Sequence, residues 1–174
     1  MKNFCISFIL IFIIILTVAV GLKSDESSVE YLRIHIRANS NSEKDQSVKY
    51  LVKEKMIEYL TPHIANCNTK KDAEEVLNTH KNNITSIINE LLNERGFSYS
   101  CNLVVRNEKF PTRVYGEFTL EEGFYDSVIV ELGKAEGDNW WCVVYPPLCF
   151  LGNGNGVKYK SKLVEIINDF KKRI

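Results

Sequence analysis

The stretch that decides the fold is "YLRIHIRANSNSEKDQSVKYL", residues 31–51, in which one periodicity gives way to another. Apolar and polar residues first alternate, as they do in a strand with one buried and one solvated face. The apolar positions are Leu32, Ile34 and Ile36, and the polar ones are Arg33, His35 and Arg37. Ser42 followed by Asp45 then resembles a capping box that opens a helix. We therefore expect a strand that leads directly into a helix.

Two helices are expected after this strand. The stripe of the first is Val48, Leu51, Val52, Met56, Tyr59 and Leu60, and Pro62 lies close to its end. Thr69 and Asp72 open the second helix, and Gly96 ends it. The stripe of the second is Ala73, Val76, Leu77, Ile84, Ile87, Ile88, Leu91 and Leu92. The short connection between the helices predicts an antiparallel pair.

The chain then changes to strand-like segments and closes with a helix. The four expected strands are "FSYSCNLVVR" (97–106), "TRVYGEFTL" (112–120), "FYDSVIVEL" (124–132) and "WWCVVY" (140–145). "LEEG", residues 120–123, is interpreted as a hairpin turn, and the strand around Val128 as buried on both faces. After a Gly/Asn linker, residues 152–156, an amphipathic helix is expected over 157–174, with the stripe Leu163, Ile166, Ile167 and Phe170.

These elements predict the fold class and the organisation of the chain. The order β-α-α-β-β-β-β-α indicates an α+β domain over residues 31–151, with a mostly antiparallel sheet packed on a helical pair. The length of 174 residues allows one such domain with appendages.

The first 21 residues predict export. They carry Lys2 and then a charge-free apolar run, which is typical of a membrane-targeting segment. The run can be a signal peptide cleaved after Gly21 or an uncleaved anchor, and both remain open. Residues 22–30 are expected to be a polar linker. Everything after Gly21 would then lie outside the cytoplasm, where disulfides persist.

The segment "NWWCVVYPPLCF", residues 139–150, is the most unusual in composition. Trp140 and Trp141 point to opposite faces of a strand, so one can join the core while the other is available to a partner. Cys142 and Cys149 bracket the corner, and export favours a disulfide between them over two buried free thiols. Closing so short a loop stabilises the fold by roughly 2–3 kcal/mol. Cys67 and Cys101 would be a second pair by count alone.

The remaining chemistry-bearing residues point away from several classes. The formal net charge is zero, which does not favour nucleic-acid binding. The cysteine and histidine spacings fit no metal site, and no phosphate-binding loop or other cofactor motif appears. His35 is a general-base candidate, but its flanking arginines disfavour a proton on it, and a solvated or partner-facing strip is the preferred interpretation. We therefore expect no cofactor, no metal and no enzyme activity.

Two long motifs resemble the stage II sporulation protein R family. "LRIHIRANSNSEKDQSVKYLVKEKM" resembles its N-terminal signature, and "FPTRVYGEFTLEEGFYDSVIVELGKAEGDNWWCVVYPPLCF" resembles its second. The resemblance implies a signalling protein that is made in the forespore and exported into the space between the sporulation membranes. There it would activate a membrane-embedded aspartic protease of the mother cell, which cuts the precursor of sigma-E.

This resemblance also gives candidate contact residues and leaves rivals open. The expected partner-binding residues are Arg33, His35, Asn39, Asn139, Trp140 and Trp141. The membrane is the second expected partner, through residues 1–21. One rival is a small extracytoplasmic thiol hydrolase or transpeptidase that uses Cys142 or Cys149 with His35. Another is a membrane-anchored structural protein whose first segment is never cleaved.

Overall fold

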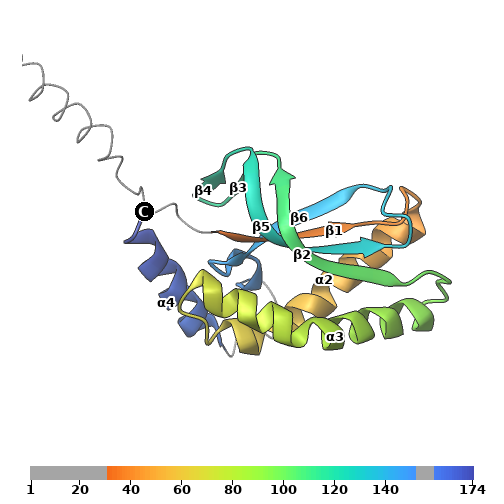
Figure 1. Cartoon of the computed structure of the whole chain (residues 1–174), viewed down its shortest axis with the longest axis horizontal. Coiled ribbons are helices and arrows are strands. Elements are labelled where there is room, and N and C mark those ends of the chain that lie inside the picture. The colour runs from red at the N-terminus through yellow and green to blue at the C-terminus, as the bar shows by residue number, and fades with distance from the viewer. Residues whose placement is uncertain (1–30, 152–158) are drawn as a thin grey trace, which may run out of the picture. The chain divides into compact units, whose positions relative to one another are not determined.

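The structure is a computed structural model that describes residues 31–151 and 159–174 (Figure 1). The expected export segment (1–21) and both expected linkers (22–30 and 152–156) lie outside the described residues. The elements are β1 (Leu32–Arg37), α2 (Glu43–Ile64), α3 (Lys70–Glu94), β2 (Cys101–Phe110), β3 (Arg113–Tyr115), β4 (Phe118–Leu120), β5 (Gly123–Leu132), β6 (Asn139–Tyr145), the short 3-10 helix η1 (Leu148–Phe150) and α4 (Lys160–Lys171).

The main sheet has four strands in the order β2-β5-β1-β6. β2 and β5 pair antiparallel, as do β1 and β6, whereas β1 and β5 are parallel. Helices α2 and α3 supply the long crossover that a parallel pair requires. The expected α+β class with a mostly antiparallel sheet is confirmed. The four central residues of β5, Ser127 to Val130, are all buried, as the sequence predicted.

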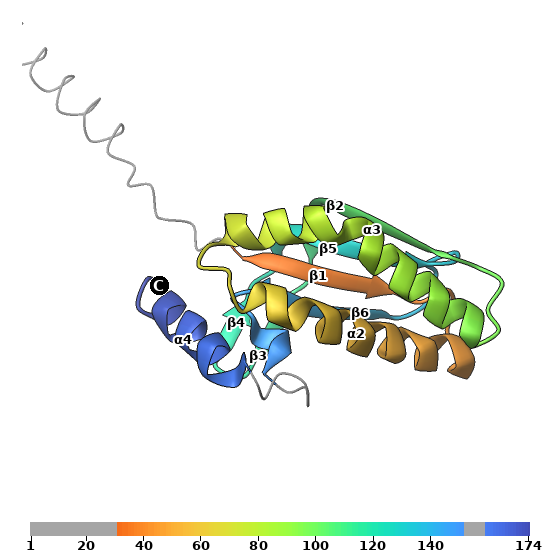
Figure 2. The same ribbon diagram turned by 90° about the horizontal axis from the view of Figure 1, so that it is seen from below.

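Helices α2 and α3 run antiparallel along one face of the sheet (Figure 2). Ser42 caps α2 by accepting a hydrogen bond from the backbone N–H of Asp45, and Thr69 and Asp72 form a complete capping box on α3. Gly96 follows α3 with a φ of +73°, as a helix stop requires. Pro62 lies close to the end of α2, as predicted, and the helix ends at Ile64.

The prediction of a hairpin turn at residues 120–123 is wrong. β4 pairs with β3 around Gly116, whereas β5 pairs with β2. The physical reason is backbone conformation. The tight turn uses a positive φ, which Gly116 adopts at +63° and which Glu121 and Glu122 do not favour. The single strand expected over 112–120 is therefore a small hairpin, and Figure 1 shows it on the side of the sheet away from α2 and α3.

Helix α4 packs by the predicted stripe. Its buried residues are Leu163, Ile166, Ile167 and Phe170. The Phe170 ring lies 6.5 Å from that of Phe118 in the hairpin and 6.1 Å from that of Tyr145 at the end of β6. Helix α4 thus connects the hairpin with the edge strand. In the part of the chain that the structure describes, no helix is both long and apolar enough to span a bilayer.

Candidate functional site

The polar side of β1 is buried, which corrects the expected solvated strip. Arg33 is 0% exposed and His35 is 1% exposed, while Arg37 is half-buried. Two segments that are distant in sequence cover this face. The β3–β4 hairpin covers Arg33, and Trp141 of β6 covers His35. The alternation of apolar and polar residues within β1 could not reveal this burial, because the residues that cover the polar side come from elsewhere in the chain.

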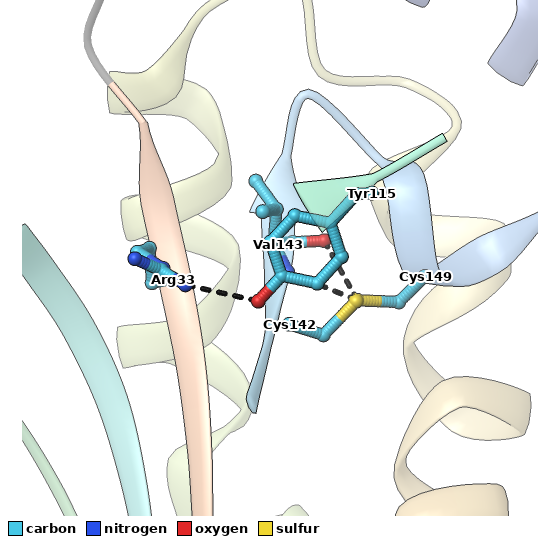
Figure 3. The surroundings of a disulfide bond; sticks show 5 residues. All are labelled: Arg33, Tyr115, Cys142, Val143 and Cys149. Carbon is cyan, nitrogen blue, oxygen red and sulfur yellow. Dashed lines mark hydrogen bonds between the residues drawn. A yellow bond between two sulfur atoms is a disulfide. The ribbon is translucent and has the colours of Figure 1, made fainter. Parts of the chain in front are cut away.

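Arg33 lies in an aromatic cage and, among the residues that the structure describes, forms no ion pair with a carboxylate. Its guanidinium is 4.3 Å from the centre of the Phe110 ring and 4.8 Å from that of Tyr125. Nη2 donates to the Tyr115 hydroxyl at 2.9 Å (Figure 3). Nε and Nη1 are buried and have no hydrogen-bond partner among the described residues. Burying an arginine in this way is costly, and the aromatic faces offset only part of the cost.

His35 is a neutral support for Trp141. The two rings stack at 3.5 Å with an interplanar angle of 20°, and Nδ1 of His35 lies 3.2 Å from Oε1 of Glu108. Burial lowers the pKa of His35 and Arg37 adds to this effect, against the opposing influence of Asn139 and Glu108. The expected direction is confirmed, although burial rather than the arginines is the main cause. The neutral imidazole donates from Nδ1 to the Glu108 carboxylate.

Beside His35, two arginines share two carboxylates. Arg37 donates to Glu131 at 3.1 Å and also to Glu108. Arg106 donates to Glu108 at 3.1 Å and to Glu131 at 3.3 Å. These four side chains form an ion-pair network in which each arginine contacts both carboxylates, so their charges compensate one another.

Asn39 builds a loop rather than facing solvent. Its Nδ2 donates to Asp45 at 2.8 Å, and its Oδ1 accepts the backbone N–H of Lys134 at 2.9 Å. Asn41 accepts the backbone N–H of Asp138 at 2.6 Å, and the buried Lys49 donates to the Asp138 carbonyl at 3.0 Å. The first sequence motif therefore holds the loop 133–138, which leads into Asn139 and the two tryptophans.

Asp45 is the centre of this loop clamp. It is buried and accepts hydrogen bonds from Ser40 at 2.5 Å and from the Tyr99 hydroxyl at 2.6 Å, besides the one from Asn39. Burial alone would raise the pKa of this carboxyl, but the hydrogen bonds from Ser40, Tyr99 and Asn39 outweigh it and lower the pKa. A charged, satisfied carboxylate thus fixes the start of α2 to the sheet.

Asn139, Trp140 and Trp141 begin β6 at the edge of the sheet. Asn139 is exposed and both tryptophans are half-buried, so neither joins the fully buried core. Trp140 is in register with Ile36 and Trp141 with His35, which places the two indoles on opposite faces, as predicted. Trp141 also makes an edge contact with Phe110, with ring centres 4.7 Å apart.

Cys142 and Cys149 form a disulfide (Figure 3). Their Cα atoms are 6.1 Å apart, and the Cys149 sulfur accepts the backbone N–H of Val143 at 3.1 Å. The bond ties η1 to the edge strand. The expected second pair is wrong, since Cys67 and Cys101 are buried free thiols. Each thiol instead faces a helix carbonyl, that of His63 for Cys67 and that of Thr85 for Cys101.

Removing the disulfide should destabilise the domain. We expect Cys142→Ser/Cys149→Ser to lower the free energy of unfolding by roughly 2–3 kcal/mol, because the unfolded chain regains the closed loop's entropy. Urea unfolding with and without reductant measures this. The wild type should lose the same amount in reductant, and the double variant should lose none. Equal stability of the two proteins without reductant would contradict the role of the bond.

Trp141 should matter for stability through its stacking on His35. We expect Trp141→Ala to lower the free energy of unfolding by about 2–3 kcal/mol, because it uncovers a buried imidazole and part of Phe110. Trp141→Phe keeps an aromatic ring there and should cost less than about 1 kcal/mol. Urea unfolding followed by circular dichroism compares them. Equal losses in both variants would mean that the stack contributes little.

Sequence reasoning missed the residues that surround Arg33, His35 and Trp141. They are Glu108, Phe110, Arg113, Tyr115 and Tyr125. The available signal is the concentration of aromatic residues around Pro111 and Gly123. The sequence places these residues on strands but does not show that they surround the same side chain. Within residues 31–151 and 159–174, no group of three or more His, Cys, Asp or Glu side chains is placed to hold a metal ion.

Comparison with known proteins identifies a family whose model includes both of the long sequence motifs. The family model of stage II sporulation protein R matches residues 28–155. Stage II sporulation protein R of Bacillus subtilis (strain 168) is 30% identical over 173 residues, covering 93% of this chain and 77% of that protein. No solved structure matches. The match spans β1 through η1 and includes both motifs, so the chain belongs to the stage II sporulation protein R family of sporulation proteins.

Proposed function

We propose that this chain is an exported signal made in the forespore, and that it activates a membrane-embedded aspartic protease of the mother cell. Activation leads to processing of the sigma-E precursor during endospore formation. The observation that carries the proposal is membership of the family, through a match that includes the whole described sheet. The apolar segment at residues 1–21 supports export, and the intermembrane space is the proposed location.

The proposed mechanism is preferential binding to the active state of the protease. A ligand shifts an equilibrium only by its difference in affinity for the two states. Asn139, Trp140 and Trp141 are the accessible members of the candidate set, so we assign direct contact to them. Arg33 and His35 are buried and Asn39 is bonded internally, so these three position the contact residues.

The thiol-hydrolase alternative is less well supported. It needs a free thiolate at Cys142 or Cys149, and the disulfide occupies both sulfurs. Burial raises the pKa of Cys67 to about 11, with Asp72 adding to it, and burial raises that of Cys101 to about 11. Such thiols are poor nucleophiles near neutral pH. We therefore propose that the chain acts by binding and is not an enzyme.

The proposed function is tested in sporulating cells that lack this gene. An immunoblot of the sigma-E precursor should show that it accumulates, and a wild-type copy should restore processing. Rescue by the Cys142→Ser/Cys149→Ser variant as well would show that the bond acts only as a structural cross-link. Normal processing without the gene would remove the signalling proposal.

A further inference from the structure

We propose that the junction of α2 and α3 is a pH-sensitive joint, in which protons taken up by His63 and His80 push the two helices apart and loosen their connection. This device belongs to the fold itself and goes beyond the proposed function. His63 lies in the last turn of α2, and His80 lies within α3. Both side chains are half-buried, and their ring centres are 4.0 Å apart. The two helices lie side by side (Figure 2), so repulsion between these rings acts directly on their packing.

The contacts of His80 fit a neutral imidazole. Its Nδ1 lies 2.7 Å from the Tyr59 hydroxyl, and this hydroxyl accepts a hydrogen bond from Asn83 at 3.0 Å. Because the oxygen already accepts from Asn83, its own proton is available to an unprotonated Nδ1. A proton on Nδ1 would meet the hydroxyl proton, so the hydroxyl would have to turn and the bond would have to reverse. The Tyr59 ring also contacts both imidazoles, with its centre 5.4 Å from that of His63 and 5.5 Å from that of His80.

No carboxylate of the two helices is placed to compensate a charge on either ring. Along a helix, the neighbours of a residue on the same face are three and four positions away. They are Tyr59 and Leu60 for His63, and Val76, Leu77, Asn83 and Ile84 for His80. Within residues 31–151 and 159–174, neither histidine forms an ion pair with Asp or Glu. Two protonated rings would therefore repel each other without a counter-ion between them.

The charged groups of the adjoining elements are committed elsewhere. Asp72, at the start of α3, accepts the backbone N–H groups of Asn68 and Thr69. Helix α4 lines a pocket beside the connection with two cations and two anions, which are Lys162, Arg173, Glu165 and Asp169. The end of β6 contributes Tyr145, which carries no charge at neutral or acidic pH. The two histidines are thus the groups whose charge changes at this junction between neutral and mildly acidic pH.

The direction of the pH effect follows from His63. Burial lowers the pKa of His63, and the charge of His80 lowers it further. The folded-state pKa therefore lies below the ordinary value of about 6.5, and the contribution of His63 to stability is complete above that pH. It is lost as the pH falls through the folded-state pKa. The joint is closed at neutral pH and loosens in acid.

The connection, residues 65–69, is where loosening has consequences. The Asn68 carbonyl accepts the Tyr145 hydroxyl at 2.5 Å, and Asn66 accepts a hydrogen bond from Lys162 of α4 at 2.6 Å. Cys67 is buried between these residues, and its thiol lies 3.6 Å from the His63 carbonyl oxygen. Opening the joint would release the end of β6 and helix α4, and it would expose Cys67 to solvent.

The test uses Cys67 as the reporter and Cys101 as its matched reference. Both are buried free thiols, and burial raises the pKa of each to about 11. The purified full-length chain, in detergent micelles, is labelled with dithiodipyridine at pH 7.5 and at pH 5, and peptide mass spectrometry follows each cysteine. The ratio of the Cys67 rate to the Cys101 rate cancels the common effect of pH on thiolate reactivity. We expect this ratio to rise about fivefold or more in acid, because the joint opens locally.

His63→Gln/His80→Gln removes both titrating groups and should hold the ratio within about twofold between the two pH values. His35 remains in this variant, so its own buried imidazole cannot account for the difference. Asn78→Gln, at an exposed position of α3, is the control variant and should keep the full acid response of the wild type. A wild-type ratio that acid leaves unchanged, or a rise that persists in the double variant, would overturn the joint.

His80→Gln alone provides an independent measurement that needs only one substitution. The glutamine oxygen can still accept from Tyr59, whereas the neighbouring charge is removed. Proton NMR titration should show that the pKa of His63 rises in this variant relative to the wild type, because one of its two causes of depression is gone. An unchanged pKa of His63 would mean that the two rings do not act on each other, and the proposal would be wrong.

Discussion

Gly137→Ala is expected to lower the free energy of unfolding by about 3 kcal/mol or more, although it adds only one methyl group. A Cβ at this position would lie 2.2 Å from the Ser40 carbonyl oxygen and 2.5 Å from its carbon. Both are backbone atoms, so neither can turn away, and the loop 133–138 has to move. That movement would break the hydrogen bond from Gly137 N–H to the Ala38 carbonyl, which is 2.9 Å long.

Gly123→Ala is the matched control for Gly137→Ala. A Cβ at Gly123 meets only the Tyr125 ring at 3.6 Å, which is an ordinary van der Waals contact. We expect its free energy of unfolding to stay within about 0.5 kcal/mol of the wild type. Urea unfolding followed by circular dichroism measures both variants. If the two substitutions cost the same, the close approach of the loop to residues 38–40, which follow β1, is not a stabilising feature of the fold.

Asp45→Ala is expected to lower the free energy of unfolding by about 3–4 kcal/mol at pH 6. It removes the buried acceptor of three side-chain donors, from Asn39, Ser40 and Tyr99. Each bond to a charged acceptor contributes about 1.5–3 kcal/mol, and relaxation of the donors recovers part of the loss. Asp169→Ala should cost less than about 0.5 kcal/mol, because Asp169 is exposed and pairs only at the surface of α4.

The cost of Asp45→Ala should depend on pH in a defined direction. The folded-state pKa of Asp45 lies below its ordinary value, so its stabilisation is complete above the unfolded pKa of about 3.9. Stabilisation is then lost as the pH falls through the folded-state pKa. Urea unfolding at pH 6 and pH 3 should show a smaller difference between wild type and Asp45→Ala at pH 3. A difference that grows on acidification would contradict the assignment of a charged Asp45.

Local signals predicted much of the fold. Thr69 and Asp72 fixed the start of α3, Gly96 fixed its end, and the apolar stripe of α4 was read correctly. Each of these features depends on contacts within a few residues or on a single periodic face. The hairpin was misplaced because "LEEG" and Gly116 are both turn candidates, and only the pairing of β5 with β2 decides between them.

The candidate site was less predictable, because distant segments determine its burial. Arg33 looks solvated within β1, and only the aromatic residues of β2, β3 and β5 make it a buried cation. Asn39 looks like an exposed turn residue, whereas both ends of its amide bond to groups within the domain. The pairing of Cys142 with Cys149 was predictable from compartment and proximity. The count that paired Cys67 with Cys101 carried no spatial information, and these residues lie in the loop between α2 and α3 and at the start of β2.

The most direct measurement reconstitutes the signal in growing cells of a spore-forming bacterium that are not sporulating. The cells would produce the protease and the sigma-E precursor, together with the full-length chain or the same chain without residues 1–21. We expect the precursor to be cut only with the full-length chain, because the proposed function requires the chain to be exported and to meet the protease outside the cytoplasm. Equal cleavage without the chain, or with the form that lacks residues 1–21, would contradict an exported activator.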